Sequence, residues 1–551
     1  MMKQDSSSSR LLRFIGFAVI ILATFACRLA SQALSTSISG AGNPPKTITS
    51  VTPMPGSGNS STSTPAVPPT IPANTMQLHL KLVGDARPLP EKIFGANADP
   101  FIEQLTNDPR KIQAVAQTAP AVLRFPGGSL ANYYDWRDGQ LHLNPQPNSS
   151  SYYKFWVDLA LRIAQAHPSG VHYEPYVSFA RQVGNADILI VPNLETSSIS
   201  EQTAWFQTLA SENTTPKNIE LGNEFWVAMG GDPNVMKVWP DEPTSMNVMH
   251  QYMQAFAPIV GPDAKFAVQA SGASFNYQPD DLHPFIQRLI KWDDALAPAD
   301  WFQAVTVHLY PDPNRIAAEA GNPSRDQLFT LLMGRSDQGI DRALDDIAKH
   351  LPGKEIWVTE WSPRGGSPTN LNQPEMDLVT PDMQAHLIAR TMLAMLRHPE
   401  MTKALYFELY SGNNSVFQTY VLVDGQYQPA SFAVVLQWFD QAANGSSSFQ
   451  RVVDADGTPV TGLGPFLESY LPIEGGLFES ESSTTLILQN ASSQTYWYDA
   501  TEGGQKPTPS QVQMILPNDF SATAHQPAKI ITLDPSQSIV LPPLSIMRIV
   551  W

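Results

Sequence analysis

Two glutamates of this sequence follow short hydrophobic segments that have the composition of buried strands. Glu224 comes shortly after Asn218–Leu221, and Glu360 comes directly after Glu355–Thr359. A carboxyl group at the end of a buried strand can act as a general acid, a general base or a nucleophile. Each glutamate also has a plainer interpretation, because acids favour first helical turns and solvated loops. The two form one site only if the fold brings both strand ends together.

Eight apolar segments alternate with amphipathic, helix-like stretches from Met76 onward. This alternation favours an α/β fold with a parallel sheet. Eight strands suit a closed (β/α)8 TIM barrel, although the pattern alone also fits a doubly wound sheet. The expected strands are Lys92–Asn97, Ala121–Phe125, Ala186–Val191, Asn218–Leu221, Lys265–Gln269, Ala304–Leu309, Glu355–Thr359 and Ala404–Leu409.

In a barrel, Glu224 would end strand four and Glu360 would end strand seven. These strands face each other across the mouth that the carboxyl ends of the strands form, where the active sites of barrel enzymes lie. Trp226 and Trp361 stand close to the two glutamates. Their indoles could stack on the apolar faces of a sugar ring. Because the strand count places Glu224 and Glu360 at facing strand ends, the sequence predicts one site with two carboxylates.

The helical periodicity ends at Gly445, and short alternating segments follow, which predicts an all-β sandwich. The stretch Gln77–Val83 also alternates and is expected to pair with that sandwich. The predicted layout is an export signal or anchor over 1–30, a linker over 31–75, a sandwich-pairing strand over 76–84, the catalytic barrel over 85–445 and the sandwich over 446–551.

Three basic residues precede the apolar run Phe14–Ala26, which is short for a membrane span and typical of an export signal. Ordinary cleavage, lipid anchoring at Cys27 and an uncleaved membrane anchor stay open. All three predict an extracellular or cell-surface protein. Residues 31–75 are mostly Ser, Thr, Pro and Gly, a composition that predicts a disordered tether.

The 551 residues carry a formal net charge of -17. This balance opposes nucleic acid as a partner, because nucleic acid rewards clustered Lys and Arg. The sequence has no zinc-type His/Cys spacing, no phosphate-cradling glycine loop and no Gly-x-Ser-x-Gly elbow. We therefore expect a neutral substrate and a site that needs neither metal nor cofactor. The oligomeric state is left open.

Gly222–Glu224 with a strand-seven Glu360 resembles the signature of glycoside hydrolase clan A, a group of retaining barrel glycosidases. Arg124–Gly128, followed by Trp136–Gly139, is similar to the second-strand motif of family 51 α-L-arabinofuranosidases, and Leu541–Ser545 resembles their last strand. Families 39 and 79, which include β-xylosidases and β-glucuronidases, share the barrel, the sandwich and the carboxylate pair and stay open as alternatives. The resemblance implies a retaining hydrolase of oligosaccharides or polysaccharides.

In such an enzyme Glu360 attacks the anomeric carbon while Glu224 protonates the leaving oxygen, and Glu224 then activates water. Carboxyl groups roughly 5 to 5.5 Å apart give retention, and a larger gap implies inversion. The resemblance also implies that Asn223 binds the sugar 2-hydroxyl. It implies further that Arg124 holds Glu360 ionised by a charge-assisted hydrogen bond.

His308 and Tyr310 are two residues apart on strand six, so they share a face, and the resemblance makes them pocket residues. Tyr310 is expected to donate to the nucleophile, while a structural core histidine stays the alternative for His308. Further candidates for sugar contacts are Asn97, Trp136, Trp226, Trp361 and Glu408. A non-catalytic carbohydrate-binding surface protein is the alternative of a different class.

Overall fold

The structure is a computed structural model. It describes residues 75–98, 100–101, 108–143, 151–227, 241–276, 284–363, 378–409, 418–462, 467–501, 506–522 and 525–551. The predicted export signal and almost all of the predicted linker lie outside these residues. None of the helices in the described part of the chain is long and apolar enough to cross a membrane.

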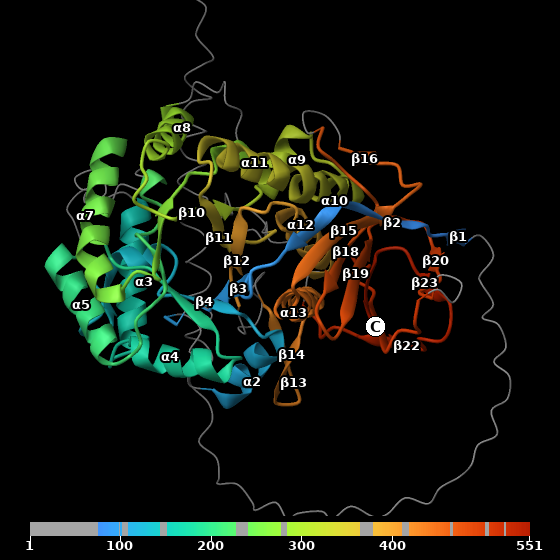
Figure 1. Cartoon of the computed structure of the whole chain (residues 1–551), viewed down its shortest axis with the longest axis horizontal. Helices are drawn as coiled ribbons and strands as arrows, with labels where there is room; N and C mark the ends of the chain where they lie inside the picture. Colours follow the sequence, from blue (N-terminus) through green and yellow to red (C-terminus); the bar gives the residue numbers. More distant parts are fainter. Residues whose placement is uncertain are drawn as a thin grey trace, which may run out of the picture.

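Eight parallel strands close into a barrel in which the chain passes once around, each strand next to the one before it. They are β3 (Phe94–Asn97), β4 (Val122–Phe125), β7 (Asp187–Ile190), β8 (Asn218–Glu220), β9 (Lys265–Gln269), β10 (Ala304–Leu309), β11 (Glu355–Trp361) and β12 (Met401–Tyr406). Every predicted barrel strand is present, and the predicted (β/α)8 barrel is confirmed. Figure 1 shows the barrel beside the C-terminal sheets.

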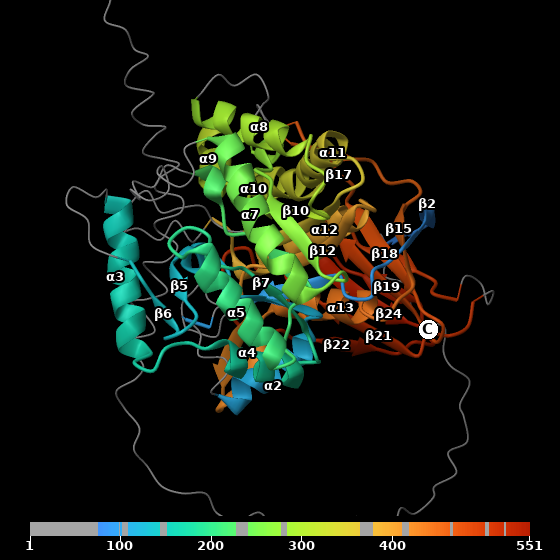
Figure 2. The ribbon, with the colours of Figure 1, turned by 60° about the vertical axis from the view of Figure 1, so that its left-hand side comes forward.

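Helices surround the barrel, with α5, α7 and α8 on its outer side in Figure 2. The helices are α2 (Pro109–Thr118), α3 (Ser151–Ala166), α4 (Tyr173–Gln182), α5 (Ile199–Ser211), α7 (Glu242–Val260), α8 (Pro284–Leu296), α9 (Pro313–Glu319), α10 (Arg325–Gly334), α11 (Ile340–His350), α12 (Pro381–Leu396) and α13 (Ser431–Ala443). Local sequence explains their starts: Thr380 caps α12 ahead of Pro381, and Ser198 with Glu201 forms a capping box on α5.

Alternate side chains of the barrel strands belong to two separate cores. Inside the barrel lies a small cluster that includes Val122, Leu189, Ala267 and Trp357. The residues between them point outward and pack on the helices in the main core. The barrel interior is therefore filled below the mouth, and its polar residues gather where the strands end.

Two sheets, antiparallel except for one parallel pair in the smaller sheet, form the predicted C-terminal sandwich, which is confirmed. The larger sheet has the order β2 (Leu80–Pro88), β15 (Ser448–Asp454), β18 (Ile473–Glu479), β19 (Thr484–Asn490), β24 (Ser545–Val550), β21 (Gln511–Ile515) and β22 (Ile531–Leu533). The smaller sheet holds β1 (Met76–Gln77), β20 (Tyr496–Tyr498) and β23 (Ile539–Leu541). The first two strands of the described chain thus pair with the last domain, and Leu78, Leu488 and Leu541 pack in its core.

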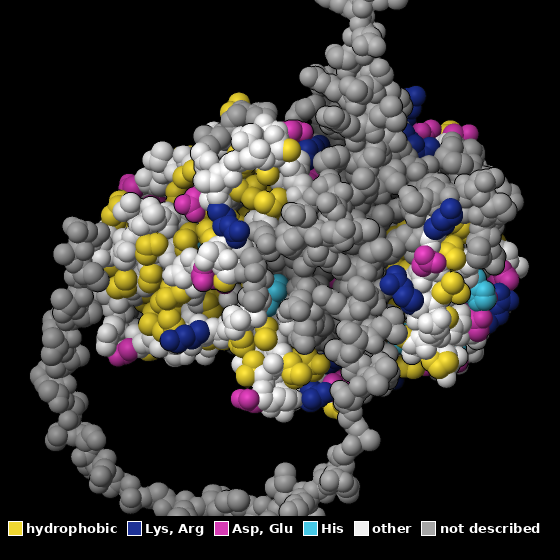
Figure 3. Space-filling view, turned by 180° about the vertical axis from the view of Figure 1, so that it is seen from behind, with side chains coloured by type: hydrophobic (Ala, Val, Ile, Leu, Met, Phe, Trp, Pro, Cys, Tyr) yellow, Lys and Arg dark blue, Asp and Glu magenta, His cyan; other side chains and the backbone are white. Residues whose placement is uncertain are grey.

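The basic side chains of the described residues on the face drawn in Figure 3 lie singly among acidic and apolar ones. They form no broad positive patch on that face. This distribution agrees with the net charge of -17.

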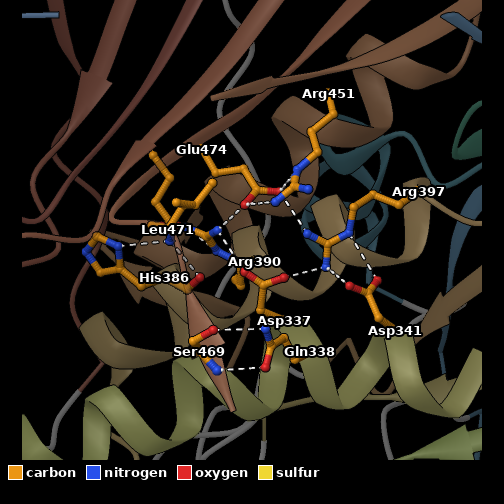
Figure 4. A network of polar contacts seen from close by, with 11 residues as sticks. Asp337, Gln338, Asp341, His386, Arg390, Arg397, Arg451, Ser469, Leu471 and Glu474 are labelled. Atoms are coloured by element: carbon orange, nitrogen blue, oxygen red, sulfur yellow. Dashed lines mark hydrogen bonds and ion pairs between the residues drawn. The ribbon is translucent and has the colours of Figure 1, made fainter. Parts of the chain in front are cut away.

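A buried ionic network joins the barrel to the sandwich (Figure 4). Arg390 of α12 contacts Glu474 of β18 at 2.5 Å and Asp337 at 3.1 Å. Arg397 reaches the same two carboxylates, and Arg451 of β15 lies 2.9 Å from Glu474. Burial would raise the pKa of Glu474, but the three guanidinium groups hold it below its usual value. Glu474 is therefore the anion on which the network centres.

We expect Glu474→Gln to lower the midpoint of thermal unfolding by several degrees. Removing one partner of a buried ion pair costs about 3–5 kcal/mol, because it leaves the other charge uncompensated. Calorimetry measures the shift. Glu479→Gln, at the exposed end of the same strand, is the matched control and should leave the midpoint nearly unchanged. Equal losses in the two variants would contradict the role given to the network.

Asp440 of α13 is buried, and burial raises the pKa of its carboxyl well above the usual value. Because the pKa is higher in the folded chain than in the unfolded chain, stability falls as the pH rises from the unfolded towards the folded value. Asp440→Asn should therefore raise the unfolding midpoint at neutral and alkaline pH and change it little below about pH 4. A difference that is constant across the pH range would contradict this explanation.

Candidate active site

Arg124 of β4 lies fully buried at the mouth of the barrel. Its Nε donates to Glu220 at 2.7 Å, its Nη1 to Glu360 at 2.5 Å and its Nη2 to the Oδ1 of Asn223 at 2.8 Å. Nη1 also lies 3.4 Å from the Oδ1 of Asn97. Burial would lower the pKa of Arg124, but the two carboxylates raise it, so the guanidinium stays charged. One cation thus holds side chains from three other regions of the barrel.

The turn that carries Glu224 has a left-handed backbone, with φ of 83° at Gly222 and 50° at Glu224. Asn132 brackets the turn: its amide donates to the carbonyl of Asn223 at 2.9 Å and its side-chain oxygen accepts from the N–H of Asn223 at 3.2 Å. Gln269 of β9 accepts from the N–H of Phe225 at 2.8 Å. A positive φ is costly for glutamate. These neighbouring bonds fix the backbone that aims its side chain.

A β-bulge in β11 places Glu360. The pairing of β11 with β10 skips Thr359, between Val358 and Glu360. The Oγ1 of Thr359 donates to Glu220 at 3.1 Å while Glu360 meets Arg124. Two successive side chains therefore face the barrel interior, which regular alternation does not allow and a bulge does.

Trp361 follows the bulge and lies on the other side of the strand. It is 1% exposed and packs against Tyr406, with the ring centroids 5.4 Å apart, in the core between barrel and helices. Its indole packs in this core, and the expected sugar contact of Trp361 stays a prediction.

His308 and Tyr310 share the face predicted for them and reach the two glutamates. The Oη of Tyr310 donates to Glu360 at 2.6 Å, and the Nδ1 of His308 lies 2.7 Å from Glu224. The Nε2 of His308 lies 3.2 Å from the Oγ1 of Thr359. Burial would lower the pKa of His308, but the carboxylates of Glu360 and Glu224 raise it to about 10. His308 is therefore positively charged at neutral pH.

The two predicted catalytic carboxylates meet at this mouth. One oxygen of Glu224, one oxygen of Glu360 and a ring nitrogen of His308 lie within 4.8 Å of one another. Glu360 is 5% exposed, whereas Glu224 is only partly buried. The arrangement can deliver a proton from one side of a bound group while a nucleophile stands opposite.

Two clusters in the described part of the chain offer three metal-ligand atoms each. The first consists of Glu224, His308 and Glu360, where the positive charge of His308 would repel a metal cation. The second is the exposed trio Asp135, Asp138 and His142, in which Asp135 already binds Arg137 at 3.0 Å.

The remaining predicted contact residues are divided between the site and its surroundings. Asn97 is buried and donates to the carbonyl of Thr359 at 2.9 Å, so it holds the bulge. The indole of Trp136 donates to a carbonyl of α5, and the backbone carbonyl of Trp226 accepts from Arg288 of α8. Both tryptophans pack on the main core. Glu408 is buried, two residues beyond the end of β12.

Four residues of the site were not predicted from the sequence: Glu220, Thr359, Asn132 and Gln269. Glu220 carried a usable signal, because an acid inside an apolar barrel strand needs a buried partner. The other three are uncharged residues whose contacts come from strands or loops distant in the sequence. Nothing in their local sequence marks them.

No family model matches the sequence, and none of the curated proteins matches it either. Solved structures do match. A family 51 α-L-arabinofuranosidase from Bifidobacterium longum is 15% identical with a TM-score of 0.60, and the match covers 86% of this chain and 99% of that one. The chain has the fold of the family 51 enzymes.

Two other glycoside hydrolases share this fold. A family 44 xyloglucanase from Paenibacillus polymyxa is 13% identical with a TM-score of 0.54, covering 86% of this chain and 99% of that one. A 4-O-α-L-rhamnosyl-β-D-glucuronidase from Fusarium oxysporum is 11% identical with a TM-score of 0.50, covering 86% and 100%. The fold is thus shared by enzymes that act on different sugars.

Arg124→Leu should lower the unfolding midpoint sharply at neutral pH, because it leaves Glu220 and Glu360 without their counter-ion, at a cost of about 3–5 kcal/mol. The loss should shrink in acid, where these carboxylates take up protons. Calorimetry across a pH series measures it. Arg110→Leu removes an exposed pair with Asp108 and should change little, because solvent screens such pairs. A pH-independent loss at Arg124 would contradict the ionic explanation.

Proposed function

We propose that the chain is an exported retaining glycoside hydrolase that cleaves O-glycosidic bonds by double displacement. The observation that carries the proposal is that Glu224 and Glu360 meet at the mouth of the barrel. One carboxylate oxygen of Glu224 lies within 4.8 Å of one carboxylate oxygen of Glu360. Retaining enzymes hold the two carboxyl groups roughly 5 to 5.5 Å apart, and inverting enzymes hold them farther apart to admit a water. The fold shared with known glycosidases supports the same reaction class.

Glu360 is the proposed nucleophile. Arg124 and Tyr310 each donate to one of its oxygens, at 2.5 and 2.6 Å. These bonds fix the orientation of the carboxylate. It attacks the anomeric carbon through an oxocarbenium-like transition state to form a glycosyl-enzyme ester.

Glu224 is the proposed acid and base. It protonates the departing oxygen in the first step and takes a proton from water in the second. The charged His308, 2.7 Å away, stabilises the carboxylate that remains after the first step. The left-handed turn holds the side chain opposite Glu360 while its charge changes.

Asn223 is the proposed contact for a sugar hydroxyl. Its Oδ1 accepts from Arg124, while its Nδ2 is buried and has no hydrogen-bond partner among the described residues. A buried donor without a partner is costly unless a ligand supplies an acceptor. A 2-hydroxyl beside the anomeric carbon would supply one, and that contact can strengthen at the transition state.

The charges at the site favour a neutral sugar. Arg124 and His308 are its cations within the described residues, and each is already paired with carboxylates. A uronic acid would bring a further negative charge to a mouth in which neither of these cations is left without a carboxylate partner. We therefore propose α-L-arabinofuranosides as the first substrates to test, with β-xylosides next and β-glucuronides as the charged comparison.

The test is hydrolysis of chromogenic arabinofuranosides, xylosides, glucuronides, glucosides and galactosides by the full chain. Glu224→Gln and Glu360→Gln should each lower kcat about a hundredfold or more, since each removes a group required in the transition state. Glu174→Gln, on the exposed side of α4, is the matched control and should retain full activity.

Proton NMR of the first-formed sugar should show the anomer of the substrate, which establishes retention. Azide should restore turnover to Glu224→Ala with an activated substrate, because this anion attacks the glycosyl-enzyme ester without needing a general base and releases Glu360 with a glycosyl azide as the product. Full activity in Glu360→Gln would overturn the assignment of the nucleophile. Polysaccharide binding without hydrolysis of any substrate would favour the non-catalytic alternative.

A further inference from the structure

Glu220 is a third carboxylate of the site, and the proposed reaction gives it no step. It lies on β8, four residues before Glu224, and is 0% exposed. Its Oε2 accepts from Arg124 at 2.7 Å and its Oε1 accepts from the Oγ1 of Thr359 at 3.1 Å. A side chain with no exposed surface cannot touch a substrate, so any role of Glu220 must act through these neighbours.

The hydrogen-bond chain through Thr359 has a defined direction. A carboxylate can only accept, so the single hydroxyl proton of Thr359 points towards Glu220. The Oγ1 of Thr359 must then accept from the Nε2 of His308, 3.2 Å away, which requires a proton on that nitrogen. The other ring nitrogen faces Glu224 at 2.7 Å. Glu220 is therefore connected to His308 across two hydrogen bonds.

We propose that Glu220 is a positioning residue that fixes Arg124 directly, and His308 through Thr359, in the charged form in which they contact the two proposed catalytic carboxylates. This role rests on the proposed function of those carboxylates. One buried anion would thereby position both the group that contacts the proposed nucleophile, Arg124, and the group that contacts the proposed acid, His308.

The charged groups around His308 support this role. Glu220 and Glu224 face it from β8 and the turn that follows, at 3.8 and 2.7 Å, and Glu360 faces it from β11 at 3.5 Å. Tyr310 of its own strand and Arg124 of β4 are both bonded to Glu360. Burial would raise the pKa of Glu220, but Arg124 and His308 hold it below the usual value. Glu220 is thus an anion at any pH at which the site would work.

An amide at position 220 would reverse the direction of the hydrogen bonds that link this position through Thr359 to His308. In Glu220→Gln the side-chain oxygen can still accept from Arg124, while the amide nitrogen donates to Thr359. The hydroxyl of Thr359 would then point towards the Nε2 of His308, which must lose its proton to accept. The imidazole should become the neutral form that is protonated on Nδ1.

Nitrogen-15 NMR of the imidazole rings in the full chain tests this directly. The His308 signals are assigned by their loss in His308→Gln. In the unaltered protein both ring nitrogens should carry protons at neutral pH. In Glu220→Gln the titration midpoint should fall by about one pH unit or more, and an unprotonated Nε2 should be seen at neutral pH.

Three variants distinguish an effect transmitted by the hydrogen bonds from Glu220 through Thr359 to His308 from a general disturbance of the barrel. Thr359→Val breaks the link to Glu220 while keeping the side-chain shape, and it should also lower the midpoint. Thr359→Ser keeps the hydroxyl and should restore the original spectrum. Glu355→Gln removes a carboxylate that binds Lys265 and Thr402 on the same barrel and should leave the His308 signals unchanged.

The proposal is overturned if His308 stays doubly protonated with an unchanged midpoint in either Glu220→Gln or Thr359→Val. It is also overturned if Glu355→Gln shifts the signals as much. With any glycoside that the protein hydrolyses, Glu220→Gln should move the alkaline limb of the kcat/KM profile to lower pH. If no glycoside is hydrolysed, the proposed function fails, while the NMR result still decides the role of Glu220.

Discussion

The structure of the site depends on one buried positive charge. Arg124 cannot be removed from water without compensation, and its partners Glu220, Asn223, Glu360 and Asn97 come from three other barrel strands and the turn after one of them. No two neighbouring strands supply this set. The barrel must close before the charge is satisfied, so formation of the site and closure of the fold are one event.

Around this charge the backbone departs twice from regular structure, and both departures aim a glutamate. The turn after β8 takes a positive φ at Glu224, and β11 skips a pairing at Thr359. Each costs stability that neighbouring hydrogen bonds offset, from Asn132 in the first case and from Asn97 in the second. Irregular backbone of this kind occurs at functional sites, where regular geometry would point a required side chain away from the site.

Regular elements of this fold could be predicted from the sequence, whereas these two irregular segments could not. Barrel strands are continuous apolar runs bounded by polar residues, so all eight were found, and counting them was enough to pair Glu224 with Glu360. The sandwich strands β15 and β18 have seven residues each but mix polar with apolar residues, so their sequence pattern is weaker. The bulge before Trp361, which sets the direction of its side chain, leaves no local pattern in the sequence. Thr359 was missed because its contacts come from strands β8 and β10.

The fixed charge of Glu220 gives the proposed reaction a constant electrostatic setting. Before the first step, protonated Glu224 is neutral, and Arg124 with His308 balances Glu220 with Glu360. In the glycosyl-enzyme ester Glu360 has lost its charge and Glu224 has gained one, so the sum is again zero. A site that kept both cations but lacked the anion at position 220 would carry a net positive charge in both states. That charge would oppose the oxocarbenium-like transition state between them.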